Sequence, residues 1–239
     1  MENITMHEKI ISVIKKNRIS TVEVADALNK TGVIEGPRPL IKGKFVVGKV
    51  QYIYGHSESN WPIHEQGQYL SEGGILYVDT FNCNNKAAFG DIVAKYFILY
   101  KGIEGIVVNG LMRDVHTLVK EDYPLWCNGI TPLGCYNKNV YPDNDTLEIA
   151  QKRKIFFENG VMIADDSGIT FIEGDKINQD TLNRLEFIEL QEDIWYFCID
   201  TLKWSTYKTI CEKAYLKDKT LLPETLRIKL EEYQNIIGA

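Results

Sequence analysis

The chain has 239 residues, 44% of them apolar, which is enough to bury a full core in one large domain or in a domain with an appendage. Its 27 basic and 33 acidic residues leave a formal net charge of −6, and no Lys/Arg block follows a phosphate backbone, so direct nucleic-acid binding is not expected. No segment approaches the roughly 20 apolar residues of a membrane span. We therefore expect a cytoplasmic protein without a membrane partner.

Cysteine usage gives no framework for a metal or for disulfides. The five cysteines are odd in number and lack the close paired spacing of zinc sites. We interpret them as free, mostly buried thiols, with a disulfide or metal role as the less favoured alternative. They are Cys83, Cys127, Cys135, Cys198 and Cys211.

The first part of the chain predicts two helices followed by a strand. Apolar residues between Ile4 and Asn17 recur at helical spacing, and Ser20 opens a capping box for a helix through Leu28. After a turn-rich segment, Lys44 to Tyr54 is β-branched and aromatic, which is typical of a strand.

The middle of the chain predicts a strand, a loop, a helix and a second strand. The strands are Ile75 to Asp79 and Gly105 to Val108, and Gly90 to Tyr100 between them has helical spacing. This order within about 35 residues is typical of a right-handed parallel crossover. Because α/β sheets bind ligands beyond the carboxyl ends of such strands, we expect the site in the loops after Val78 and Val108.

Further strands are predicted before the chain turns helical. Lys154 to Phe157 and Val161 to Ala164 are predicted as strands around Glu158-Asn159-Gly160, with Gly168 to Ile172 as another. Asp165-Asp166-Ser167 is interpreted as the turn before that last strand, rather than as a metal site.

The character of the sequence changes near residue 178. From Thr181 onward it is mostly helical, with a Pro-initiated helix at Pro223. We therefore predict an α/β domain over residues 1–178, N-terminal helices included, and a helical C-terminal extension over residues 179–239.

Arg113 and Asp114 form the candidate site, a few residues beyond the predicted strand that ends at Val108. A guanidinium can bind a carboxylate or enolate oxygen through two hydrogen bonds, and a carboxylate is a ligand for a hard divalent cation. Taken alone, an Arg-Asp dipeptide is more often a surface ion pair or a turn. The surrounding sequence decides its weight.

That surrounding run is GGILYVDTFNCNNKAAFGDIVAKYFILYKGIEGIVVNGLMRDVHTL, which begins at Gly73. In it a strand ending in Asp, a loop and a Gly-acidic helix start precede Arg-Asp. Together with STVEVADAL from Ser20 and VMIADDSGITFI from Val161, it resembles the family of the regulator of ribonuclease activity A (RraA) and the 4-hydroxy-4-methyl-2-oxoglutarate (HMG/CHA) aldolases. The resemblance covers residues 18 to 175, discontinuously.

The resemblance implies a fold and an assembly. The expected fold class is α/β, a swivelling β/α/β domain of the RraA-like type, here with a mostly helical C-terminal extension. The family also implies a homotrimer or homohexamer with active sites in clefts between neighbouring subunits.

The resemblance also implies roles for individual residues. In the aldolase branch the Arg of this motif holds the pyruvoyl end of the substrate, which makes Arg113 a substrate-binding and catalytic residue. The Asp after it supports Mg²⁺ or Mn²⁺, which makes Asp114 the metal ligand. Helix-start amides bind the substrate carboxylate, as unpaired N–H groups at a helix start attract anions. With the arginine, the implied substrate-binding set is Gly90, Asp91, Ile92, Val93 and Arg113.

Asp91 is a second catalytic candidate, which would hold a metal-bound water or carry a proton. Its alternative interpretation is a helix-start residue favoured by the helix dipole. His116 follows the pair, and its spacing matches no metal motif. Glu189 or Glu192 could complete a neighbour's metal site, as a C-terminal carboxylate does in some relatives, although a solvated helix face is the favoured interpretation.

The implied function is a divalent-metal-dependent carbon–carbon lyase that acts on a small 2-oxo acid through a pyruvate enolate, as a class II aldolase or an oxaloacetate decarboxylase. Two departures keep alternatives open. Thr117 stands where the aldolase motif has an acidic residue, and the loop from Thr80 to Lys86 is not Gly-rich. A non-catalytic RraA-like regulator that binds a partner protein is the second hypothesis. A recruited enzyme with another substrate is the third.

Overall fold

An eight-stranded sheet organises the first three quarters of the chain, with the strand order β1-β6-β5-β3-β2-β7-β8 and β4 beside β5. The computed structural model describes residues 4–237. Parallel strands form the centre of the sheet: β2 (Val46–His56), β3 (Ile75–Phe81), β5 (Gly105–Met112) and β6 (Leu125–Ile130). Antiparallel strands lie at its two ends: β1 (Arg38–Pro39), β7 (Val161–Asp165) and β8 (Gly168–Ile172). The carboxyl ends of the central strands therefore share one edge.

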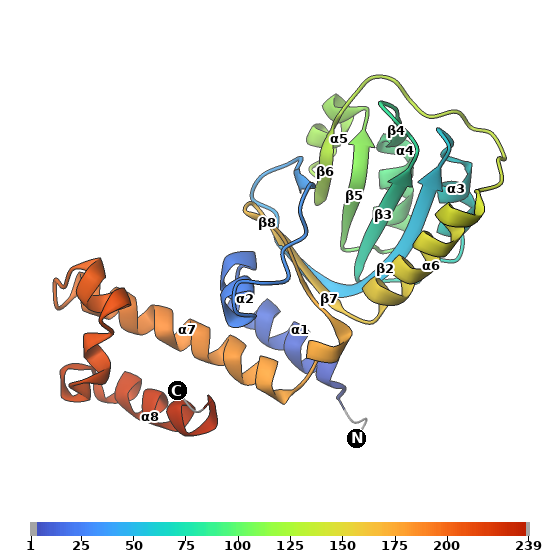
Figure 1. Cartoon of the computed structure of the whole chain (residues 1–239). Helices are drawn as coiled ribbons and strands as arrows, with labels where there is room; N and C mark the ends of the chain where they lie inside the picture. Colours follow the sequence, from blue (N-terminus) through green and yellow to red (C-terminus); the bar gives the residue numbers. More distant parts are fainter. Residues whose placement is uncertain (1–3, 238–239) are drawn as a thin grey trace.

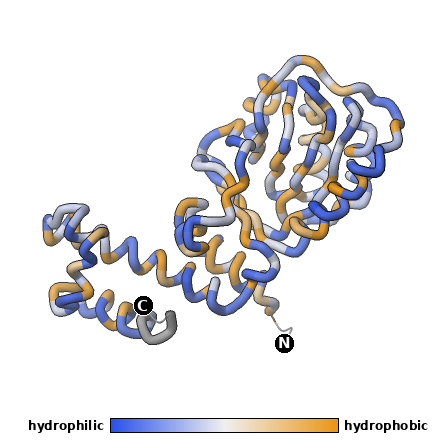
Figure 2. The backbone as a smooth tube through the Cα atoms, in the orientation of Figure 1, coloured by the Kyte–Doolittle hydropathy of each residue, from blue (hydrophilic) through white to orange (hydrophobic). Residues whose placement is uncertain are grey.

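Helices cover both faces of this sheet, so each face has its own apolar core (Figure 1). One face carries α3 (Trp61–Gly67), α4 (Asp91–Lys95) with its π-helical continuation η1 (Tyr96–Tyr100), and α5 (Val115–Glu121). The other face carries α6 (Asn144–Glu158). Figure 2 shows apolar stretches along the strands between these helices, as buried parallel strands require. The structure thus has the predicted α/β class.

The strands of the crossover lie where the sequence predicts them, and the second is longer than expected. β3 includes the predicted Ile75 to Asp79, and β5 runs on past Val108 to Met112 across a bulge. β4 (Ala87–Phe89) forms inside the segment predicted as a loop and pairs with the extended part of β5. Because β5 is longer, Arg113 follows the strand directly.

The predicted strand from Lys154 to Phe157 is wrong, because these residues form the last turns of α6. Asp143 caps this helix by accepting a hydrogen bond from the Thr146 amide at 2.7 Å. Phe157 is buried against the sheet, where its ring stacks on Tyr77 with centroids 4.1 Å apart, while Ile155 and Phe156 are exposed. Burial of Phe157 explains why an aromatic stretch with strand-like composition is helical here. Glu158-Asn159-Gly160 consequently joins a helix to β7, and is not the turn of a hairpin.

The two N-terminal helices begin with capping boxes. Thr5 caps α1 (Met6–Asn17), and Ser20 caps α2 (Thr21–Ala27) as the sequence predicts. The Asp165 carboxylate at the end of β7 also accepts hydrogen bonds from the Thr21 amide and hydroxyl, at 2.8 and 2.7 Å. The predicted turn of the β7–β8 hairpin therefore also holds α2 in place.

The C-terminal part is helical and extends away from the sheet (Figure 1). α7 (Gln179–Asp200) begins against α1 and α2, and α8 (Glu224–Ile237) packs back along α7. The short turns η3 (Tyr207–Cys211), η4 (Ala214–Leu216) and η5 (Lys219–Leu221) connect the two helices. This part has a separate apolar core, formed by Leu190, Ile194, Cys198, Tyr215, Leu222 and Leu230. In the described part of the chain, no helix is long and apolar enough to span a membrane.

Candidate functional site

Arg113 and Asp114 lie at the carboxyl end of β5, between that strand and α5. Asp114 has a left-handed backbone conformation with φ of 59°, and its side chain does not cap α5. Its Oδ2 instead lies 3.3 Å from Arg113 Nε and accepts a hydrogen bond from the Asp91 amide at 3.3 Å. The sharp backbone turn thus directs the carboxylate toward the start of α4.

Two glycines provide the space for this ion pair. A β-carbon at Gly134 would lie 2.2 Å from Arg113 Nη1, and one at Gly90 would lie 2.4 Å from Asp114 Oδ2. The same β-carbon at Gly90 would be 3.2 Å from Arg113 Nε. The Arg113 side chain is 46% exposed, so solvent still reaches the guanidinium. It therefore lies in a slot with glycine at two walls and an opening to solvent.

The start of α4 is joined to the pair through its backbone. The Arg113 amide donates a hydrogen bond to Phe89 O at 3.0 Å, and the Ile92 amide donates to Asp91 Oδ1 at 2.7 Å. The side chain of Ile92 is exposed and that of Val93 is buried in the core, so only their backbones belong to the cluster. The structure therefore places Gly90, Asp91, Arg113 and Asp114 together, as the sequence suggested.

Asp91 and Asp114 are the carboxylates available there for a divalent cation. Mg²⁺ is usually held by one or two carboxylates and keeps several water ligands, so two carboxylates at one helix start fit such an ion. Among the described residues, no group of three or more His, Cys, Asp and Glu side chains is suited to hold a metal. Thr117 lies in the first turn of α5, where its amide donates to Asp114 O at 3.0 Å.

The other candidates lie on helices. His116 is exposed on α5, next to the pair. Glu189 and Glu192 lie on α7, outside this cluster, where partial burial raises the pKa of both carboxyls and nearby carboxylates, Glu23 among them, add to the effect. The side-chain amide of Asn17 (Nδ2) donates to Glu189 Oε2 at 2.5 Å.

A second arginine–aspartate pair lies near the same edge of the sheet, on the face that α6 covers. Asp79 at the end of β3 is 1% exposed and forms an ion pair with Arg153 of α6. Its carboxylate also accepts hydrogen bonds from Tyr52 Oη and Asn109 Nδ2, each at 2.8 Å. Burial and the neighbouring Asp79 charge raise the pKa of Tyr52 well above its usual range. The carboxylate has partners from two further strands and one helix.

This buried network continues toward the strand that carries Arg113. Asn109 Oδ1 accepts a hydrogen bond from Asn128 at 2.9 Å, and Asn109 O accepts one from Thr80 Oγ1 at 2.8 Å. Asn109 lies inside the bulge of β5. The sequence pattern identified Asp79 as a strand-ending carboxylate but gave no role to Arg153, which directly precedes the segment wrongly predicted as a strand. The available signal was the helical i, i+4 spacing of Arg153 and Phe157.

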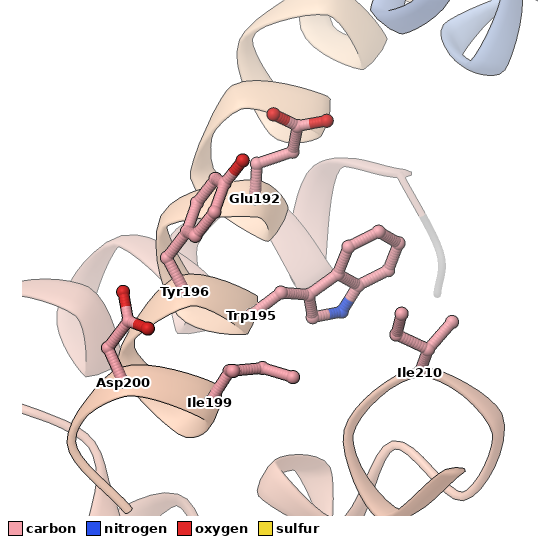
Figure 3. Close-up of a pocket in the computed structure, with 6 residues that line it drawn as sticks. All are labelled: Glu192, Trp195, Tyr196, Ile199, Asp200 and Ile210. Carbon is pink, nitrogen blue, oxygen red and sulfur yellow. The ribbon is translucent and has the colours of Figure 1, made fainter. Parts of the chain in front are cut away.

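A mostly apolar cavity in the C-terminal part lies far along the chain from this edge. It has a volume of about 280 Å³ and is bounded by successive turns of α7 and by Ile210 (Figure 3). The lining side chains are Glu192, Trp195, Tyr196, Ile199, Asp200 and Ile210. It contains none of the residues that the sequence predicted for substrate binding.

Comparisons with known proteins concern the sequence and the fold. The family model RraA-like, described as Aldolase/RraA, matches residues 21–171. The chain is 26% identical to Protein DlpA of Legionella pneumophila over 203 residues. The aligned part covers 81% of this chain and 32% of DlpA. Over 117 residues it is 29% identical to a Halalkalibacterium halodurans protein named "Putative 4-hydroxy-4-methyl-2-oxoglutarate aldolase", 47% of this chain and 54% of that protein. The chain thus spans about a third and about half the length of these relatives.

Solved structures share the fold. Streptomyces coelicolor RraAS2, described as an unusual member of the RNase ES inhibitor RraA protein family, has a TM-score of 0.58 and 21% identity, with 77% of this chain and 94% of that chain covered. An uncharacterized protein from Pseudomonas syringae pv. tomato has a TM-score of 0.60 and 17% identity, with 83% and 96% covered. At these identities the likeness concerns the fold alone.

Proposed function

Since this chain belongs to the RraA-like (Aldolase/RraA) family, we propose that it is a divalent-metal-dependent carbon–carbon lyase acting on a small 2-oxo acid. The proposed reaction is retro-aldol cleavage of a 4-hydroxy-2-oxo acid or decarboxylation of oxaloacetate, and either one releases pyruvate. The observation that carries the proposal is the half-exposed Arg113 guanidinium in its glycine-walled slot, beside two carboxylates at one helix start.

Arg113 would hold the oxygen on which negative charge develops. A guanidinium offers paired N–H donors to a carboxylate or enolate oxygen. Gly90 and Gly134 confine the side chain, while its 46% exposure lets a small acid reach it. A donor held in place before the reaction stabilises a developing oxyanion without reorganisation.

Asp114 would hold Mg²⁺ or Mn²⁺ directly, and Asp91 would support the ion through water. A bound divalent cation would polarise the 2-oxo group as a Lewis acid. The Asp91 amide donates to the Asp114 carboxylate, and the Ile92 amide donates to the Asp91 carboxylate. A substrate carboxylate would replace these side chains as the acceptor of the two N–H groups. Asp91 would then be placed to carry a proton to or from the substrate.

We propose the same assembly that the family resemblance implies, a homotrimer or homohexamer with the site between subunits. Apolar side chains exposed near the slot support this proposal, because grouped exposed apolar residues mark protein contacts. They are Ile92, Ile130 and Leu133. We also propose residues 1–178 as the family domain and residues 179–239 as its extension.

The test is pyruvate release from oxaloacetate and from 4-hydroxy-4-methyl-2-oxoglutarate, with Mg²⁺, Mn²⁺ or excess chelator. We expect metal-dependent turnover that falls by roughly 10²–10³ in Arg113→Ala and Asp114→Asn. Arg184→Ala is the matched control, because it removes the arginine of another exposed pair, with Asp180 at 2.8 Å, outside the site. Turnover that persists in Arg113→Ala would refute the assignment.

A non-catalytic regulatory role is the second proposal, and the limited carboxylate set favours it. Thr117 occupies the position where the aldolases have an acidic residue. Thr117→Glu would add a carboxylate to the first turn of α5, and more ligand charge should tighten Mn²⁺ binding roughly tenfold. Absence of both metal binding and turnover in the wild type and in this variant would favour the regulator.

A further inference from the structure

Two free cysteines lie beside the Arg113 slot, and the proposed lyase chemistry uses neither of them. Cys83 is in the turn after β3 and is 3% exposed, while Cys135 follows Gly134 and is half-buried. Cys135 packs against the apolar cluster that contains Cys83, and the two thiols interact with each other. The Cys83 thiol also donates to Phe81 O at 3.6 Å. The pair connects two loops that flank the slot.

The backbone around this pair is held by Glu58. The Glu58 amide donates to Asn82 O at 3.1 Å, and Glu58 O accepts from the Tyr136 amide at 2.8 Å. Asn82 and Tyr136 are the chain neighbours of the two cysteines. The Cys135 amide also donates to Ala87 O at 2.9 Å. A disulfide requires the two Cα atoms within about 7 Å of each other. These backbone hydrogen bonds bring the segments of both cysteines to Glu58 and Ala87, so the two cysteines are neighbours in space.

A basic side chain adjoins the thiols. Lys86 follows Cys83 in the same turn, pairs with Glu58 at 2.7 Å, and its ammonium lies 5.5 Å from the Tyr136 ring centroid. The interaction with Cys135 lowers the pKa of Cys83, while burial acts in the opposite direction and the opposed charges of Glu58 and Lys86 contribute less. The same interaction raises the pKa of Cys135. A hydrogen-bond donor that lowers the pKa of a thiol favours the thiolate, which is the nucleophilic form.

We propose that Cys83 and Cys135 form a reversible disulfide when the protein meets a peroxide, which makes this pair a redox modification site beside the Arg113 slot. Cys127 is buried on β6, Cys198 is buried on α7, and Cys211 is exposed on the C-terminal part. The described contacts join no other two cysteines.

The reaction balances with hydrogen peroxide as the oxidant. The Cys83 thiolate attacks one peroxide oxygen, the O–O bond breaks, and water leaves after protonation, so that Cys83 becomes a sulfenic acid. The Cys135 sulfur then attacks the Cys83 sulfur, the S–O bond breaks, and a second water leaves with the Cys135 proton. Two thiols lose two electrons, and one peroxide becomes two waters.

The disulfide would act on the slot through Gly134. This glycine precedes Cys135 and lies against Arg113 Nη1. A covalent link from Cys135 to the turn after β3 therefore restrains one wall of the slot. We expect slower amide hydrogen exchange over residues 133–136 in the oxidised protein, with return to the reduced rate after dithiothreitol.

Peptide mapping of the full chain tests the proposal. Because Cys127 and Cys135 share the tryptic peptide between Lys120 and Lys138, the experiment uses the Cys127→Ser background. After hydrogen peroxide and alkylation of the remaining thiols, we expect a linked Cys83–Cys135 peptide that dithiothreitol separates. Cys211→Ser should retain the link, and Cys135→Ser should lose it.

Several results would overturn the proposal. One is alkylation of Cys83 and Cys135 to the same extent before and after oxidation. Another is irreversible sulfinic acid on Cys83 without a linked peptide. A link that runs through Cys211 between molecules would also contradict it. Circular dichroism establishes that each variant is folded, and Cys83→Ala provides a second variant at the buried position. None of these readouts requires lyase activity.

Discussion

Two arginine–aspartate pairs lie at the same edge of one sheet and differ in almost every physical respect. Asp79 is 1% exposed, and its partner Arg153 reaches it from α6, far along the chain. Arg113 and Asp114 are chain neighbours with side chains 46% and 36% exposed. The first carboxylate accepts hydrogen bonds from three residues, whereas the second contacts one guanidinium and one amide.

This difference in burial indicates that the Asp79 pair stabilises the fold and that the Arg113 pair is free to bind a ligand. A buried charge must be fully paired, since removing one partner leaves the other in a medium that solvates it poorly. An exposed pair contributes little to stability, so its groups can exchange their partners for a ligand. We expect the Asp79 pair to hold the strand ends in place and the Arg113 pair to meet the substrate.

The largest expected effect follows from breaking the buried pair. Asp79→Ala should lower the free energy of unfolding by about 3–5 kcal/mol, because Arg153 and the Tyr52 hydroxyl lose their acceptor. Urea unfolding followed by circular dichroism measures it. Asp180→Ala, which breaks an exposed pair, should cost less than about 1 kcal/mol. Equal costs for the two variants would contradict the comparison.

The next effect is alkaline destabilisation through the tyrosines that face Asp79. Burial raises the pKa of Tyr52 and Tyr77, so the folded state keeps protons that the unfolded chain releases near pH 10. The contribution of these two tyrosines to the free energy of unfolding is therefore fully present below about pH 10. Above that pH it falls by about 1.4 kcal/mol per pH unit for each tyrosine.

Unfolding by urea at a series of pH values measures this slope. Tyr52→Phe should reduce it, while Tyr69→Phe, at an 83% exposed position, should leave it unchanged. A wild-type slope that Tyr52→Phe does not alter would show that the buried network does not control alkaline stability.

Closing the slot should act on turnover more than on stability. Gly134 has no positive φ, so its backbone accommodates alanine. The added β-carbon would lie 2.2 Å from Arg113 Nη1, however, so the guanidinium would have to move. We expect Gly134→Ala to reduce metal-dependent pyruvate release roughly tenfold to hundredfold, since small misplacements of a binding group are costly. Gly129→Ala is the matched control, because its nearest contact would be Leu111 at 3.2 Å. Loss of turnover in both variants would point to general disturbance of the sheet.

The smallest expected effect is on stability at the exposed pair. Asp114→Asn keeps a residue that tolerates φ of 59° and removes only the charge. Its free energy of unfolding should change by less than about 1 kcal/mol, as urea titration can measure. A change as large as that of Asp79→Ala would mean that the two pairs are not functionally distinct.

Much of the fold was predictable because its signals are local. The capping box at Ser20, the buried strands that include Ile75 to Asp79 and Gly105 to Val108, and the helix from Gly90 depend on neighbouring residues, and all are confirmed. The strand predicted from Lys154 to Phe157 failed because its aromatic residues suit a buried surface of either type. Packing on Tyr77, not composition, made the segment helical.

The candidate site likewise contains residues that the sequence could place and contacts that only the tertiary structure shows. Arg113, Asp114 and the helix start at Gly90 follow the ends of predicted strands, so spacing along the sequence was enough to place them at one edge. Gly134 against Arg113, Arg153 against Asp79 and the Cys83–Cys135 contact join segments that no periodicity relates. These partners depend on where α6 and the loop before it cross the strand ends. The path of the chain over the sheet is set by the burial of both faces at once, which is a property of the whole fold and not of any stretch of sequence.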